Sequence, residues 1–218
     1  MKFNHLFIFF VLILSFTNGC RRFEEEKLVA QAEPFIPKNL YPIERLPTHF
    51  NRVVVLPCFY SDQDSPILDY VDEVFHQELS QERIFETLRL SPEQMKEHFG
   101  VERVASNLPL PENFLMRLEE LTAANGVLFV DIDSYRPYRP LALGVRSKLV
   151  DLKTGEFMWA IDETFDSGHA DVIAGTKVFQ NQSQVRAISA KTSGSVMHSP
   201  RIFAKYVASS CFATMPMR

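Results

Sequence analysis

The strongest constraint on the fold is an alternation of short apolar strands with helices that begin at Ser-Pro pairs. The β-branched run that opens the domain ends at a proline and predicts a strand buried on both faces. A serine before a proline places a capping side chain next to a residue that suits the first helical turn. The expected strands here are 51–57 and 84–90, and the expected helices are 66–82, capped by Ser65, and 91–100, with Ser91 and Gln94 as a capping box.

The second half of the chain predicts a run of strands between helices. Asn125-Gly126 follows an amphipathic helix and predicts its end, because glycine is favoured beyond a helix C-terminus. Thr154-Gly155 predicts a hairpin turn, followed by Phe157, Trp159 and Ile161 on one face of a strand. The expected helices are 112–124, a short one over 178–185 within an otherwise loop-like stretch from 168 to 196, and 199–211, and the expected strands are 127–133, 141–151 and 156–165. This order predicts a single α/β sandwich domain with a mixed sheet of about five strands and flanking helices.

The first twenty residues predict an exported protein. Lys2 precedes an apolar run over 6–14 that is too short to cross a bilayer as a helix and has the layout of a secretory signal. Gly19-Cys20 resembles the lipobox of bacterial lipoproteins, in which the cysteine thiol is acylated and becomes the new N-terminus. The resemblance implies a signal peptide over 1–19 and a palmitate-bearing Cys20. The alternative is an ordinary signal peptide, or an uncleaved anchor, with an incidental cysteine.

Residues 20–50 predict a tether between the anchor and a domain over 51–218. Prolines recur through this segment, fix φ and donate no hydrogen bond, so we expect an extended, irregular chain. The protein is then expected in the cell envelope, attached to a membrane by its lipid and facing the periplasm. In some bacteria an Asp after the lipidated cysteine retains a lipoprotein in the inner membrane. Arg21 stands there instead, which favours the outer membrane by analogy.

Composition and cysteine spacing exclude several classes of function. The net charge of −4 argues against nucleic acid as a partner, because that binding depends on clustered Lys and Arg. Neither a glycine-rich phosphate loop nor a Cys/His zinc spacing is present, so we expect no cofactor and no metal. Cys58 and Cys211 form a disulfide, which export permits, or remain two buried free thiols.

Several strings resemble a periplasmic α/β superfamily. They are the strand ending in Leu56-Pro57, the helix end Ala123-Ala124-Asn125-Gly126 that leads directly into a strand, and 148–156 (KLVDLKTGE) followed by Trp159. The superfamily includes the N-terminal domain of the Tol propeller protein, the curli secretion lipoprotein and the lipoprotein activators of penicillin-binding proteins. The resemblance covers roughly residues 50–165. It implies a non-catalytic lipoprotein that binds a protein partner in envelope or cell-wall assembly, and the layout is most like the activators.

The loop Tyr135-Arg136-Pro137-Tyr138-Arg139-Pro140 is the candidate for partner binding. Tyr and Arg are enriched at binding hot spots, and proline reduces the entropy lost on ordering. The candidate residues are Tyr135, Arg136, Tyr138 and Arg139. The alternative is an exposed connection between strands that proline makes stiff.

Two acidic groups keep other functions open. Asp131 and Asp133 lie two apart on a strand, as paired carboxylates do, and Asp166 and His169 follow the last strand. An envelope hydrolase or a metal-dependent enzyme built on these groups is one alternative, although no nucleophile elbow surrounds Ser167. A structural subunit of a secretion or ring assembly, and with it a homo-oligomer, is another. The acidic residues 62–73 are expected to favour a helix start through its dipole, with a cation site as the alternative.

Overall fold

The computed structural model describes residues 31–41, 43–186 and 196–218. The expected signal peptide, Cys20 and the first part of the expected tether lie outside the described residues, so they stay predictions. Among the described residues, no helix is both long and apolar enough to span a membrane.

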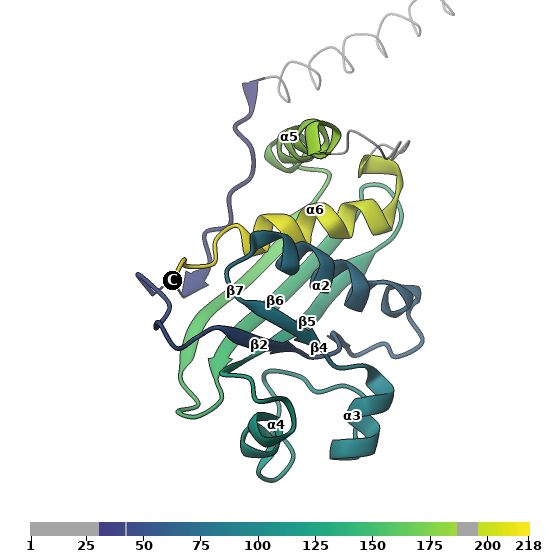
Figure 1. Cartoon of the computed structure of the whole chain (residues 1–218). Coiled ribbons are helices and arrows are strands. Elements are labelled where there is room, and N and C mark those ends of the chain that lie inside the picture. Colours follow the sequence, from purple (N-terminus) through teal and green to yellow (C-terminus); the bar gives the residue numbers. More distant parts are fainter. Residues whose placement is uncertain (1–30, 42, 187–195) are drawn as a thin grey trace, which may run out of the picture.

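The chain forms the α/β fold that the sequence predicted, with a mixed sheet of seven strands in the order β1-β7-β6-β5-β2-β4, and β3 beside β5 (Figure 1). The strands are β1 (Leu40–Tyr41), β2 (Arg52–Val55), β3 (Phe59–Tyr60), β4 (Glu86–Arg89), β5 (Gly126–Arg136), β6 (Ala142–Asp151) and β7 (Phe157–Asp166). Strand β2 is parallel to β4 and β5, whereas β5, β6 and β7 are antiparallel. The five predicted strands are present. The expected count was too low because β1 and β3 have only two residues each and leave no periodic pattern.

Helices cover the sheet on both faces (Figure 1). The α-helices are α2 (Val71–Glu82), α3 (Pro92–Phe99), α4 (Phe114–Thr122), α5 (Ala170–Arg186) and α6 (Pro200–Phe212), with short 3-10 helices η1 (Pro66–Asp69) and η2 (Val196–His198). Helices α2 and α6 pack against one face around Trp159 and Phe212. Helices α3 and α4 pack against the other face around Phe99 and Phe114. The two clusters leave part of β6 and β7 without a helical cover on the α3–α4 side.

Helix caps explain where several elements begin. The Ser91 hydroxyl accepts from the Gln94 amide, and the Gln94 side chain accepts from the Ser91 amide, so the predicted capping box is confirmed. Ser199 caps α6 as expected. The prediction for Ser65 was wrong in detail. Ser65 and Pro66 start the 3-10 helix η1 without a side-chain cap, and α2 begins at Val71.

Gly126 is needed for packing and not for ending a helix, which corrects the sequence prediction. Helix α4 ends four residues earlier, at Thr122, and Ala123 directly after it takes the left-handed conformation with φ of 50°. Gly126 is the first residue of β5. A Cβ at Gly126 would lie 2.1 Å from Cζ of Phe50, so only glycine leaves room for that ring. Phe50 is fully buried.

Helix α5 is much longer than the short helix expected over 178–185. It starts at Ala170, and Asp171 Oδ1 accepts from the amide of Val172. Gly175 lies within this helix against Tyr206 of α6, where a Cβ would come 2.3 Å from the phenol oxygen. The sequence prediction was too short because the apolar pattern is weakly periodic and a glycine lies inside the helix. The contact with α6 stabilises the helix in the folded chain.

The packed part of the chain includes residues before 51. The amide of Phe35 donates to the carbonyl of Asp171, and its ring meets Phe165 edge-on at 4.9 Å. Strand β1 pairs with β7, and Leu46 and Phe50 are buried. The division into leader, tether and domain at residues 19 and 50 stays a prediction, but Phe35, Leu40, Leu46 and Phe50 pack against the domain.

Candidate interaction site

The predicted loop closes the β5–β6 hairpin and lies beside the start of α6 (Figure 1). Arg136 is the last residue of β5, and Ala142 opposite it is the first of β6. The Arg139-Pro140 peptide bond is cis. Antiparallel strands of ten and eleven residues carry the loop, so its ends are fixed by the sheet.

Arg136 fastens the loop to the end of β7. Its Nη2 donates to Asp166 Oδ2 at 2.8 Å, and its Nε donates to the carbonyl of Pro140. Asp166 Oδ1 also accepts from the amide of Gly168. Partial burial would raise the pKa of Asp166, but the Gly168 amide and the Arg136 guanidinium outweigh it and lower that pKa. Arg136 therefore has a structural role, because it holds the two ends of the loop together and joins them to β7.

Tyr138 and Arg139 occupy the outer part of the loop. Tyr138 is 80% exposed, the largest exposed fraction among the exposed large apolar and aromatic side chains of the described residues. The Nε of Arg139 donates to the carbonyl of Met197 in η2 at 3.1 Å, and its Nη2 lies against Nε2 of His198. The loop therefore holds an aromatic side chain in solvent on a backbone that is tied down on both sides.

Tyr70 and Arg201 join this surface, and the sequence analysis missed both. The hydroxyls of Tyr70 and Tyr135 lie 3.1 Å apart, and burial together with this contact raises the pKa of Tyr70. The Arg201 guanidinium stacks over the Tyr70 ring at 5.9 Å and pairs with Glu73. Residues 70 and 201 are far from 135 in sequence, and only the helix packing of α2 and α6 brings them together. We call Tyr70, Tyr135, Arg136, Tyr138, Arg139 and Arg201 the Tyr-Arg surface.

The predicted carboxylate pair at 131 and 133 is engaged in separate contacts. Asp131 is buried, and its carboxylate accepts from the amide and the hydroxyl of Ser106. Burial raises the pKa of Asp131 despite these bonds. The strand register shifts between 132 and 134, and Asp133 pairs with Arg146, which also holds Asp162. The two carboxylates therefore have different partners on the sheet.

The second acidic group lies elsewhere on the sheet. Asp131 is opposite Arg146, whereas Asp166 is opposite Ala142, four residues away along β6. The backbone amide of His169 donates to the carbonyl of Asp166, and the hydroxyl of Ser167 is buried without a partner in the described part of the chain. The structure does not bring the two groups into one site.

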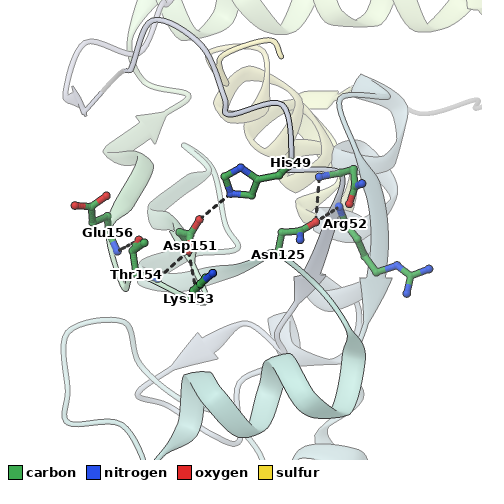
Figure 2. A network of polar contacts seen from close by, with 8 residues as sticks. His49, Arg52, Asn125, Asp151, Lys153, Thr154 and Glu156 are labelled. Carbon is green, nitrogen blue, oxygen red and sulfur yellow. Dashed lines mark hydrogen bonds and ion pairs between the residues drawn. The ribbon is translucent and has the colours of Figure 1, made fainter.

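Hydrogen bonds satisfy the polar groups at the opposite end of the antiparallel sheet (Figure 2). Asp151 Oδ1 accepts from the amides of Lys153 and Thr154 at 2.8 and 2.9 Å, which closes the β6–β7 turn. His49 Nε2 lies 3.5 Å from Asp151 Oδ2. Burial would raise the pKa of Asp151, but the amides of Thr154 and Lys153, with His49, outweigh it and lower that pKa. Figure 2 also shows Asn125 bonded to the start of β2, so this end joins three segments.

The two cysteines are buried and free in the structure, as in the second alternative above. Burial raises the pKa of both thiols, and Asp72 adds to this effect at Cys58. Asp72 accepts from the Cys58 amide and pairs with Arg103 at 2.9 Å. Part of the acidic stretch at 62–73 thus ties a loop to α2. The described residues hold no group of three or more metal-ligating side chains.

No protein-family model matches the chain, and no curated protein matches it in sequence. Solved structures do match. The PelC dodecamer subunit from Paraburkholderia phytofirmans matches with a TM-score of 0.50 at 12% identity, over 82% of this chain and 96% of that chain. Lipoprotein GNA1162 from Neisseria meningitidis has a TM-score of 0.41 at 12% identity, over 62% and 98%. The LpoB C-terminal domain from Salmonella enterica has a TM-score of 0.35 at 14% identity, over 64% and 93%. The likeness to PelC shows that this chain shares its fold.

Proposed function

We propose that this protein is a non-catalytic lipoprotein of the cell envelope and that it binds a protein partner through the Tyr-Arg surface. The observation that carries the proposal is the exposure of Tyr138, at 80%. The loop that bears it is held by the β5–β6 strands, by the contact of Arg136 with Asp166 and by the contact of Arg139 with η2. A loop backbone that is fixed before binding loses little entropy on binding. Tyr and Arg dominate binding hot spots because they combine apolar area with hydrogen-bond donors.

The contacts of the acidic groups support a non-catalytic role. Asp131 is engaged by Ser106, and Asp133 by Arg146. A hydrolase needs a nucleophile within hydrogen-bond reach of a base, and the described residues show no such pair around Ser167. These contacts give the carboxylates a structural use.

The test is chemical crosslinking in cells that produce the full chain, followed by purification of the chain and identification of attached proteins. Tyr138→Ala removes the exposed ring. Tyr41→Ala is the matched control, because Tyr41 is 57% exposed on β1, away from the Tyr-Arg surface. We expect at least one protein that is attached to the wild type and to Tyr41→Ala but not to Tyr138→Ala. If the wild type, Tyr41→Ala and Tyr138→Ala were attached to the same proteins, the proposal would be contradicted.

The anchor belongs to the proposal as well. A lipid on Cys20 would hold the domain at a membrane, with the outer membrane favoured. Labelled palmitate should enter the wild-type chain and not a Cys20→Ala variant. A Cys20→Ala variant that stays membrane-bound would count against the lipid anchor and leave the binding surface untouched.

A further inference from the structure

The Tyr-Arg surface holds one arginine that no carboxylate neutralises in the described part of the chain. Arg136 pairs with Asp166, and Arg201 pairs with Glu73. Within the described residues, Arg139 contacts the carbonyl of Met197 and the ring of His198 and pairs with no carboxylate. A guanidinium has five N–H donors in a planar fork, so these contacts leave donors free for a carboxylate. This uncompensated cation follows directly after the exposed Tyr138.

The sequence around this surface adds positive charge. From Val172 to the C-terminus the chain contains no Asp and no Glu. The same stretch contains Lys177, Arg186, Lys191, Arg201, Lys205 and Arg218. The whole chain has a net charge of −4, and all of its Asp and Glu residues lie before Val172. The part of α5 after Asp171, together with η2 and α6, thus forms a basic region in an acidic protein.

We infer that the partner presents an acidic segment, whose carboxylate binds Arg139 while an adjoining apolar group packs on Tyr138. The inference rests on the proposed function and adds the chemistry of the partner. A carboxylate matches the planar guanidinium and forms charge-assisted hydrogen bonds with it. Like charges across an interface would be repelled, so the same surface disfavours basic segments.

An anionic membrane is the competing occupant, and the number of free cations argues against it. Lipid surfaces are recognised by clusters of about four to eight Lys or Arg. Beside Arg139, the cations without a carboxylate partner among the described side chains from 172 onward are Lys177, Lys205 and Arg218. Arg218 follows Met217, whose carbonyl accepts from the amide of Leu46, so it lies away from the Tyr-Arg surface and leaves a smaller set there. The overall negative charge of the chain would also oppose binding to an anionic surface.

The test places an aromatic photocrosslinking residue at position 138 of the full chain in the producing cells. The adducts are measured by their yield, and mass spectrometry maps the attached segment. Arg139→Gln removes the charge, and Arg139→Lys keeps the charge without the fork. Lys153→Gln removes one charge from the exposed turn at the other end of the sheet and is the matched control.

We expect the attached segment to contain Asp or Glu beside an apolar residue. Arg139→Gln should lower the adduct yield about tenfold, as loss of a paired interface charge does. Arg139→Lys should retain an intermediate yield, and Lys153→Gln the wild-type yield. High salt should lower the wild-type yield more than the residual Arg139→Gln yield, because screening weakens a charge that only the wild type has.

Three results would overturn the inference. They are a protein segment without acidic residues, a yield that Arg139→Gln leaves unchanged, and adducts with lipid in place of protein. With the first two, the proposed function survives, because a protein still binds at position 138. No adduct at all at this position would remove the proposed function as well, so the two failures are distinguishable.

Discussion

The two ends of the antiparallel sheet use similar turn chemistry for different results. At the β6–β7 end, Asp151 binds two backbone amides and His49, and the fully buried Trp159 of β7 packs against Phe212 of α6. At the β5–β6 end, Asp166 and Arg136 also fix a turn, but Tyr138 and Arg139 remain available to solvent. The β6–β7 turn uses Asp151 internally, while Lys153, Glu156 and the half-exposed Phe157 face solvent beside it. The β5–β6 loop combines a fixed backbone with Tyr138 at 80% exposure and an arginine directly after it, and is the better suited to recognition.

The largest expected effect concerns the two aromatic residues. Trp159→Ala should lower the free energy of unfolding by about 3–5 kcal/mol, because it leaves a large cavity between β7 and α6. Tyr138→Ala should change it by less than about 0.5 kcal/mol, since the ring is exposed. Urea denaturation of both variants measures the difference. An equal loss of unfolding free energy in both variants would show that the two aromatic residues contribute equally to the stability of the fold.

Asp151→Ala should cost about 1–3 kcal/mol of unfolding free energy. The substitution leaves the amides of Lys153 and Thr154 without their acceptor. Glu156→Ala is the control, because Glu156 lies in the same turn and contributes its backbone amide. Partner adducts at position 138 should be unchanged by Asp151→Ala. A loss of those adducts in a folded variant would mean that the two ends are coupled.

Acid should weaken the β6–β7 end through Asp151. Its pKa is lower in the folded state than in the unfolded chain. Its stabilisation is therefore fully present above the unfolded pKa, about 3.9, and is lost as the pH falls through the folded pKa. Chemical denaturation at a series of pH values measures the free energy of unfolding of wild type and Asp151→Asn. The difference between the two free energies should become smaller toward low pH. A difference that stays constant would exclude this role for the carboxylate.

A small effect on stability is expected for Arg136→Ala. The Arg136–Asp166 pair is partly exposed, at 46% and 27% for the two side chains, so its loss should cost less than about 1 kcal/mol. Partner adducts at position 138 should fall several-fold, because the loop loses its attachment. Arg52→Ala, which breaks the exposed pair with Glu86, is the control for a lost surface ion pair. If both variants keep full adduct yield, the ordered loop is not what binds.

The sequence predicted the elements that carry their own local signals. Ser91 with Gln94 and Ser199 with Pro200 marked helix starts, and Thr154-Gly155 marked the hairpin. Features that depend on distant residues were missed. Gly126 was assigned to a helix end because Phe50 is remote in sequence. Phe157 was placed with Trp159 and is 50% exposed, because the register of β6 and β7 shifts beside it.

The candidate site followed the same rule. The loop residues could be chosen from the sequence because they are contiguous. Tyr70 and Arg201 could not, since α2 and α6 bring them to Tyr135 only in the folded chain. The neutralisation of Arg136 and the lack of it at Arg139 are also properties of the tertiary structure.

The packing of residues 34–50 determines how the domain would respond to mechanical load. If Cys20 anchors the chain, force from the membrane enters the domain at Phe35 and then at β1, whose residues Leu40 and Tyr41 pair with β7. The carbonyl of Asn39 also accepts from the Asp162 amide of β7. Such a short edge can be peeled away bond by bond, while the long β5, β6 and β7 ladders are left intact. Detachment of this edge segment would lengthen the connection between the membrane and the domain before the central strands bear the force.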